Sequence, residues 1–286
     1  RDLHKEYSRQ RQMCIRDRID TYNDLGYVVI ENLLSNDELE CWRTAIDTGI
    51  DQHISKKMHN NQKGESYYKN VFTQCVNMWK SSKAIKNLVL DTRNGKMASE
   101  LAGTEGMRLY HDHALIKQPW ANPTHWHSDN PYDPFYSHQM ITLWLALDDA
   151  TLKNGCLCFL PGTHKSSSFD KHVGLNENMN DLFKLYPEWK EEEPKFIEVS
   201  AGDGIFFSGM IAHAAGPNMT PRPRRAFAML FMPTGSTYNG LPAALPPEYA
   251  ESLKFGDLLD NDEHLPLLYT CLLYTSDAAD DTPCVD

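Results

Sequence analysis

The sequence predicts a mainly β protein, an antiparallel barrel or sandwich with helices packed on its outside. In the second half of the chain, short apolar segments rich in β-branched and aromatic residues follow one another, with turn residues between them. No helical pattern alternates with these segments, so a parallel sheet built from βαβ units is not expected. The predicted strands lie at residues 107–117, 140–147, 156–160, 195–199, 204–208 and 225–232.

The first elements of the chain carry clear local signals. Residues 25–32 are β-branched and predict a strand. Ser35 and Glu38 have the spacing of a capping box, and apolar side chains then recur at helical spacing. We therefore expect a helix over about residues 36–53, followed by a polar loop over residues 51–68.

The next stretch is less distinct. Residues 71–79 are compatible with either a strand or a helix. Two short helices are expected at residues 84–91 and 97–101, interrupted by the Asn-Gly pair at 94–95 and ended by Gly103.

Two connections in the second half stand out. Asn154 and Gly155 lie between apolar segments and predict a β-hairpin. Residues 165–194 form a long polar interruption of the strand pattern. A connection of this length is usually functional or disordered, and a lid over a binding site is one interpretation.

Composition narrows the class of protein. Of the 286 residues, 41% are hydrophobic and 23% are charged, which indicates a globular chain. The net charge of −11 gives no overall attraction to phosphate backbones, so nucleic acid is not an expected partner. We find neither a membrane-length apolar run nor a secretory signal pattern. Seven cysteines are too few for a disulfide framework, so we expect a reducing, cytoplasmic compartment.

Both ends of the chain look foreign to the fold. Residues 13–18 and the tail from about Cys271 resemble translated sequencing-adapter sequence and lack helical or strand periodicity. The alternative is a natural disordered terminus. We expect residues 1–18 and 270–286 to be non-native and residues 19–269 to form a single domain. That interior retains 22 Lys and Arg against 32 Asp and Glu, so it remains acidic.

A candidate metal site follows residue 123. On a strand, residues i and i+2 point to the same face, so His127 and Asp129 would both point into a barrel. A distant histidine would complete a two-histidine, one-carboxylate triad, which holds Fe(II) and leaves coordination positions open. His213, after the strand at 204–208, is the candidate. A chain of this composition contains about one His-x-Asp by chance, so a hydrogen-bonded surface pair is the alternative.

Arg224 lies 11 residues after His213. A guanidinium is the natural partner of a carboxylate, and a keto-acid cosubstrate bound to iron needs such a partner at its far end. Arg225 would point the other way on a strand, and Arg222 lies in a proline-rich turn. An exposed arginine at a strand end is the alternative interpretation of Arg224.

Further polar residues leave several interpretations open. His111, His113, His125 and His127 make two His-x-His pairs, from which a cupin-type metal site could be built. The loop that carries Tyr132, Asp133 and Tyr136 either contacts a substrate or packs on the fold. A non-catalytic jelly-roll binding module is the alternative outside enzymes.

Several motifs together resemble the phytanoyl-CoA dioxygenase family, within the Fe(II)/2-oxoglutarate-dependent oxygenase superfamily. The resemblance extends over about residues 20–235. It implies a double-stranded β-helix, which is a jelly-roll or cupin-like barrel, with flanking N-terminal helices. It also implies Fe(II), 2-oxoglutarate and O₂ as cofactor and cosubstrates. The motifs are DLGYVVIENLLSNDELE at 24–40, His127-x-Asp129, WLALDDATLKNGCLCFLPGTHK at 144–165, GDGIFF at 202–207, and the run from His213 to Arg224.

Carried over by position, the resemblance assigns roles to seven residues. His127, Asp129 and His213 match the iron ligands, and they are our candidate catalytic and metal-binding residues. Arg224 matches the arginine that pairs with the far carboxylate of 2-oxoglutarate. The other candidate cofactor-binding residues are Trp144, which matches a tryptophan of that pocket, and Lys117 and His113, which lie on a strand that lines it.

The resemblance also bears on the reaction. Related halogenases lack the carboxylate ligand, so the presence of Asp129 favours hydroxylation. Substrate recognition in the family lies in regions that do not match, at 165–194 and after 235, so an acyl-CoA substrate is not implied. We expect an enzyme that hydroxylates a small organic substrate and releases succinate and CO₂. The sequence does not indicate the prime substrate or the oligomeric state.

Overall fold

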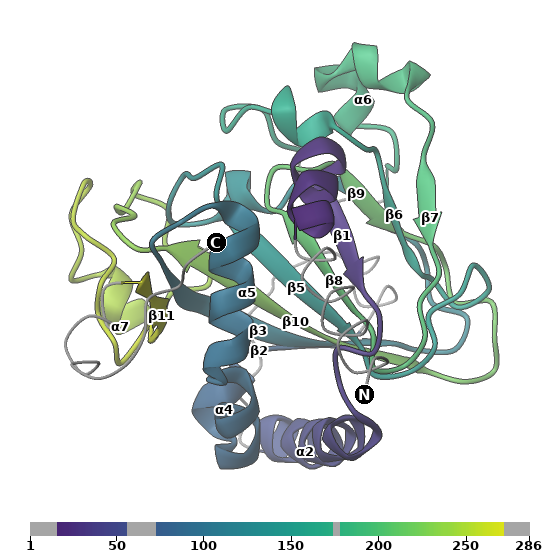
Figure 1. Ribbon diagram of the computed structural model, residues 1–286, viewed down its shortest axis with the longest axis horizontal. Coiled ribbons are helices and arrows are strands. Elements are labelled where there is room, and N and C mark those ends of the chain that lie inside the picture. The colour runs from purple at the N-terminus through teal and green to yellow at the C-terminus, as the bar shows by residue number, and fades with distance from the viewer. Residues whose placement is uncertain (1–15, 56–72, 174–177, 272–286) are drawn as a thin grey trace, which may run out of the picture.

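The described part of the computed structural model comprises residues 16–55, 73–173 and 178–271, and two antiparallel sheets dominate it (Figure 1). The larger sheet has the order β1-β8-β5-β10-β3-β11, and β2 also pairs with β3. The smaller sheet has the order β4-β9-β6-β7. The larger sheet contains β1 (Tyr27–Ile30), β2 (Thr73–Val76), β3 (Gly106–Lys117), β5 (Ile141–Ala146), β8 (Gly204–Ser208), β10 (Arg224–Pro233) and β11 (Leu267–Thr270). The smaller contains β4 (Thr124–His127), β6 (Leu157–Phe159), β7 (Lys195–Ile197) and β9 (His213–Ala215).

From β3 to β10 the chain passes back and forth between the two sheets. Strands β3, β10, β5 and β8 face β4, β9, β6 and β7, which is the arrangement of a double-stranded β-helix. The predicted fold class is therefore confirmed. All six strands predicted in the second half are present, whereas the short strands β4, β9 and β11 had no clear pattern of their own.

The larger sheet is buried on both faces, which explains its nearly continuous apolar strands. On β5, Leu143 and Leu145 belong to a core shared with the helices, whereas Trp144 belongs to a core shared with the smaller sheet. Figure 1 shows α2, α4 and α5 along one side of this sheet, away from β6, β7 and β9. The helices are α2 (Asn36–Ser55), α3 (Met78–Ser81), α4 (Lys83–Val89), α5 (Thr92–Ala102), α6 (Leu182–Leu185) and α7 (Pro247–Ala250). Residues 16–25 are also helical.

The capping box at the start of α2 is present as predicted. The Ser35 backbone N–H donates to Glu38 Oε2 at 2.9 Å, and the Glu38 N–H donates back to Ser35 Oγ at 3.3 Å. The helix continues to Ser55, and the rest of the expected loop at 51–68 lies outside the described residues. The segment at 71–79, which is compatible with a strand or a helix, contains parts of both, because β2 ends at Val76 and α3 begins at Met78.

Two local expectations were wrong. The Asn-Gly pair at 94–95 does not separate two helices but lies inside α5. A Cβ on Gly95 would lie 2.6 Å from Leu268 Cβ, so the glycine lets the helix approach β11. Asn154 and Gly155 form a turn, but they do not join a hairpin, because β5 and β6 belong to different sheets.

The long stretch after residue 162 contains short helices rather than strands. It includes η3 (Thr163–Lys165), α6 and η4 (Pro187–Glu191), and residues 174–177 lie outside the description. Tyr186 and Trp189 stack at 3.7 Å in a small core of their own. Within the described ranges, no helix has the length and apolar character needed to cross a bilayer.

Candidate metal centre and cosubstrate cavity

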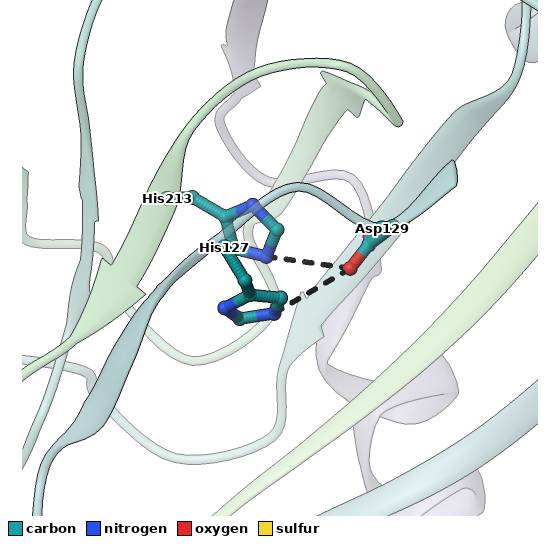
Figure 2. Close-up of side chains that lie close together, drawn as sticks. All are labelled: His127, Asp129 and His213. Carbon is teal, nitrogen blue, oxygen red and sulfur yellow. Dashed lines mark ion pairs between the residues drawn. The ribbon is translucent and has the colours of Figure 1, made fainter. Parts of the chain in front are cut away.

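Three side chains converge where the smaller sheet meets the larger one (Figure 2). His127 is the last residue of β4, and it pairs in register with His213, the first residue of β9. Asp129 begins the short helix η2 (Asn130–Tyr132) and has helical backbone angles, φ −74° and ψ −52°. The predicted alternation along a strand therefore does not apply to Asp129. The chain turns after His127, and this turn brings the carboxylate to the two imidazoles.

The distances suit a shared metal ion. Nε2 of His127 and Nε2 of His213 each lie 3.6 Å from Asp129 Oδ1. The three ligand atoms lie within 4.8 Å of one another. Ligands bound at about 2.1 Å to one ion are separated by up to about 4.2 Å, so closure onto an ion requires only small adjustments. Two imidazoles and one carboxylate on one side of an ion form the donor set of non-haem Fe(II) oxygenases.

Backbone carbonyls orient both imidazoles. His127 Nδ1 lies 2.8 Å from the His125 carbonyl oxygen, and His213 Nδ1 lies 3.1 Å from that of Ile211. A carbonyl only accepts, so each Nδ1 carries the proton and each Nε2 presents a lone pair toward Asp129. Burial, with His213 and His125 nearby, lowers the pKa of His127 well below its usual value, which keeps this imidazole neutral.

A cavity of about 470 Å³ contains the triad and extends between the two sheets. Its wall combines apolar side chains with a few polar groups, which is typical of a small-molecule site. Beyond the triad, its polar or aromatic lining residues are Gln74, Tyr110, His111, His113, Thr124, Tyr132, Asp133, Thr142, Trp144, Phe207 and Arg224.

Arg224 provides the cationic group of this cavity. Its side chain is buried, and its guanidinium carbon lies 5.0 Å from the centre of the Trp144 ring. Burial lowers its pKa to about 10, so it stays charged at neutral pH. Neither Nε nor Nη1 has a hydrogen-bond partner in the structure. A buried cation with unpartnered N–H groups beside an aromatic ring fits a carboxylate ligand.

Comparison with known proteins bears on this site directly. The family model for phytanoyl-CoA dioxygenase (PhyH) matches residues 22–226 of the chain. The chain belongs to the phytanoyl-CoA dioxygenase family. This PhyH protein is accordingly a non-haem Fe(II)- and 2-oxoglutarate-dependent dioxygenase, and the enzyme class, the cofactor and the cosubstrates expected from the sequence are confirmed.

Individual relatives agree with this assignment. A methylphosphonate hydroxylase of Gimesia maris is 26% identical over 226 residues, covering 78% of this chain and 80% of the relative. The 2-oxoglutarate-dependent carbocyclase SnoK from nogalamycin biosynthesis has a TM-score of 0.75 and 25% identity, covering 88% of this chain and 96% of SnoK. The epimerase SnoN, solved with Fe³⁺, α-ketoglutarate and nogalamycin RO, has a TM-score of 0.71 at 22% identity, covering 90% and 100%. At that identity, SnoN shows the shared fold.

The two remaining candidates for cosubstrate binding in the PhyH protein differ in position. His113 lines the cavity, and its Nδ1 lies 2.8 Å from Gln74 Nε2. Lys117 pairs across the sheet with Arg224 but is not among the described lining residues. Its buried Nζ lies 3.4 Å from Thr124 Oγ1, and burial together with the charge of Arg224 lowers its pKa to about 7. Lys117 is therefore buried beside two residues that line the cavity, Arg224 and Thr124.

Arg225 behaves as its strand position predicts. It points to the opposite face of β10 from Arg224, and its Nε and Nη2 donate to the two oxygens of Asp148 at 3.0 and 2.8 Å. This bidentate pair keeps Arg225 out of the cavity and leaves Arg224 as the arginine that faces the metal site.

Sequence reasoning missed two residues of the site. Thr142 donates to Asp129 Oδ2 at 3.1 Å, yet it lies within an apolar strand pattern and has no motif around it. Tyr110 lines the cavity next to His111, although neighbours on a regular strand point to opposite faces. The strand pairing skips Tyr110, and such a bulge has no reliable sequence signal.

Proposed function

We propose that this protein hydroxylates a small organic substrate, with His127, Asp129 and His213 as the ligands of Fe(II). In this proposal Arg224, stacked on Trp144, binds the far carboxylate of 2-oxoglutarate. When bound, iron and 2-oxoglutarate supply an oxidation by O₂ that releases succinate and CO₂ and transfers one oxygen atom to the substrate. One observation carries the proposal: the triad and the unpartnered N–H groups of Arg224 face the same cavity.

The protein contributes the orientation of the reacting groups. Arg224 and Trp144 lie on neighbouring strands of the larger sheet, so a carboxylate held between them is fixed relative to the triad. Thr142 donates a hydrogen bond to one Asp129 oxygen. The carbonyls of His125 and Ile211 accept hydrogen bonds from the two imidazoles and fix their orientation. Such preorganisation places the reactants without further rearrangement.

The cupin-type alternative has less support. Among the described residues, the cluster with metal-ligand spacing is the His127, Asp129 and His213 group. His111 and His113 line the cavity, but they do not join this cluster. A cytoplasmic location remains our proposal, supported by the free thiols of the described cysteines.

An anaerobic titration of the full chain with Fe(II) and 2-oxoglutarate tests the proposal. A keto acid chelated to Fe(II) gives a weak visible charge-transfer band, which we expect to develop with one equivalent of each. Asp129→Ala should prevent the band. Asp257 is exposed and is not among the residues that line the cavity, so Asp257→Ala is the matched control and should give the wild-type band. Metal binding without the band would contradict the role of 2-oxoglutarate, and no metal binding would contradict the triad.

A further inference from the structure

The cavity extends away from Arg224 toward His111. Along β10, the residues from Arg224 to Leu230 pair with β3 from Lys117 to His111. Six residues of strand span about 20 Å, so His111 and Arg224 lie toward opposite ends of the cavity. Thr142, which contacts Asp129, pairs with Leu230 at the His111 end. The part of the cavity beside His111 is therefore available to the prime substrate when 2-oxoglutarate occupies the Arg224 end.

A β-bulge shapes this second end. The register of β10 and β3 shifts between Leu230 and Phe231, which pair with His111 and Leu109 and leave Tyr110 between them. As a result, both Tyr110 and His111 line the cavity. The Tyr110 hydroxyl accepts the Ala244 backbone N–H at 3.1 Å and also interacts with the Asp133 carboxyl. Bulges of this kind commonly redirect side chains next to active sites.

Asp133 is the unusual group here. It lines the cavity, the residue is only 6% exposed, and its Oδ2 has no hydrogen-bond partner in the structure. Burial, with the nearby charge of Asp129, raises the pKa of this carboxyl well above its usual value. A buried polar atom without a partner is costly and calls for an explanation such as a ligand. Arg224 shows the same pattern at the other end of the cavity.

The wall around Asp133 is held firmly. Asn239 Nδ2 donates to the Asp133 carbonyl at 2.9 Å, and Asn77 Nδ2 donates to the Ala244 carbonyl at 3.1 Å. Ala243, which also lines the cavity, has a φ of 44°, a conformation that is costly for alanine. Hydrogen bonds thus connect the segment at residues 239–244 both to the loop that carries Asp133 and to Asn77.

The charges at this end do not suit an anion. The pKa of His111 falls to about 4 and that of His113 falls well below its usual value, both chiefly through burial, so both imidazoles are neutral. Among the described residues that line the cavity, Arg224 is the one arginine or lysine. When Asp133 is ionised, a phosphonate or carboxylate beside it would meet a second negative charge, and no arginine or lysine of the described lining compensates it at this end.

We propose that Asp133, Tyr110 and His111 form the subsite for the prime substrate, and that it binds a non-anionic substrate through an N–H or O–H donor. An amine and an alcohol share this chemistry, with Asp133 accepting from the donor. The inference rests on the proposed function, because it assigns the Arg224 end to 2-oxoglutarate. It excludes anionic groups from the Asp133 end, whatever the rest of the substrate carries.

Binding measurements by calorimetry test the subsite directly. The full chain, loaded anaerobically with Fe(II) and 2-oxoglutarate, is titrated with four six-carbon compounds: hexylamine, 1-hexanol, hexanoate and hexylphosphonate. The amine or the alcohol should bind at least about tenfold more tightly than both anions, since its N–H or O–H donor provides the hydrogen-bond partner that Asp133 Oδ2 lacks. Tighter binding of an anion, or no binding of the amine and the alcohol, would overturn the inference.

Variants then separate the two donors. Asp133→Ala should weaken the preferred ligand by about tenfold or more. Asp133→Asn keeps the shape and an acceptor oxygen, so it should weaken an amine strongly and an alcohol by less than about threefold. Tyr110→Phe should weaken either, because it removes the hydroxyl that interacts with Asp133. Exposed Glu251→Gln is the control and should change nothing. Unchanged ligand binding in Asp133→Ala would refute the subsite.

The affinity for 2-oxoglutarate keeps this test independent of the proposed function. All Asp133 and Tyr110 variants should bind 2-oxoglutarate as the wild type does, because Arg224 lies at the other end. Failure of the wild type to bind 2-oxoglutarate would refute the proposed function itself. Normal 2-oxoglutarate binding combined with a preference for anions would refute the subsite alone.

Discussion

The Thr142 hydroxyl donates a 3.1 Å hydrogen bond to Asp129 Oδ2, while Oδ1 of the same carboxylate faces both histidines at 3.6 Å. The two oxygens therefore have different partners. Oδ2 accepts a hydrogen bond from Thr142, and Oδ1 is directed at the position where a metal would bind. This arrangement favours a carboxylate that uses one oxygen and leaves room for cosubstrates on the ion.

Removal of the Thr142 hydroxyl should weaken the binding of Fe(II). We expect Thr142→Val to lower Fe(II) affinity by about 10–100-fold, the usual effect of losing a partner of a metal ligand. Anaerobic calorimetric titration with Fe(II) measures this. Thr142→Ser keeps the hydroxyl and should retain affinity near that of the wild type. Equal affinities for the valine and serine variants would show that the hydrogen bond does not support the site.

Loss of either ligand on the β4 side should abolish activity without unfolding the protein. His127→Ala and Asp129→Ala are both expected to stop 2-oxoglutarate turnover, measured as succinate release. The fold should persist, because both side chains line the cavity rather than the apolar core. Circular dichroism melting checks this, and exposed His138→Ala provides the control. Turnover that survives in either ligand variant would disprove the metal assignment.

Arg224→Ala should raise the 2-oxoglutarate concentration needed for half-maximal turnover. Truncating one partner of a buried charged pair costs about 2–5 kcal/mol, which corresponds to about thirtyfold or more. Steady-state succinate release at varied 2-oxoglutarate measures the change. Arg222→Ala, at an exposed position of the preceding turn, should behave as the wild type. An unchanged requirement in Arg224→Ala would place the carboxylate partner elsewhere.

The capping box of α2 should make stability sensitive to acid. The Ser35 backbone N–H, the Arg93 guanidinium and the Ser35 hydroxyl lower the pKa of Glu38 from 4.5 to about 2. A depressed pKa contributes stability that is present above pH 4.5 and is lost as the pH falls toward 2. Ser35→Ala should cost about 1 kcal/mol at neutral pH. Urea unfolding at several pH values measures both effects.

The control for the capping box is exposed Ser200→Ala, which should leave stability within about 0.5 kcal/mol of the wild type. Glu38→Gln should flatten the loss of stability between pH 4.5 and 2 relative to the wild type. The same acid dependence in both proteins would exclude Glu38 as its source.

Gly95→Ala should destabilise the protein, although alanine is normally the better residue inside a helix. The added methyl group would lie 2.6 Å from Leu268 Cβ and 3.2 Å from the Leu268 carbonyl carbon, so α5 and β11 would have to separate. We expect a cost of about 1–3 kcal/mol, as for other overpacked contacts. Thermal melting measures it against exposed Lys96→Ala in the same helix. A melting temperature at or above that of the wild type would show that the contact relaxes freely.

The sequence by itself determined the fold class, the family and the identity of the central chemical groups. Strands buried on both faces are largely apolar, so β5, β8 and β10 were visible as apolar runs, whereas β3 carries polar residues at its centre. The capping box was visible because its partners are three residues apart. His127, Asp129, His213 and Arg224 were found through local motifs and a family resemblance that spans most of the chain.

The tertiary structure alone decided how these groups meet and what surrounds them. His127 and His213 are 86 residues apart, and the pairing of β4 with β9 brings them together. That pairing depends on contacts distant in the sequence, which local propensity does not encode. The same holds for Thr142 beside Asp129 and for the bulge that turns Tyr110 into the cavity. Spacing along one strand specifies a face, whereas register between strands specifies which side chains share a site.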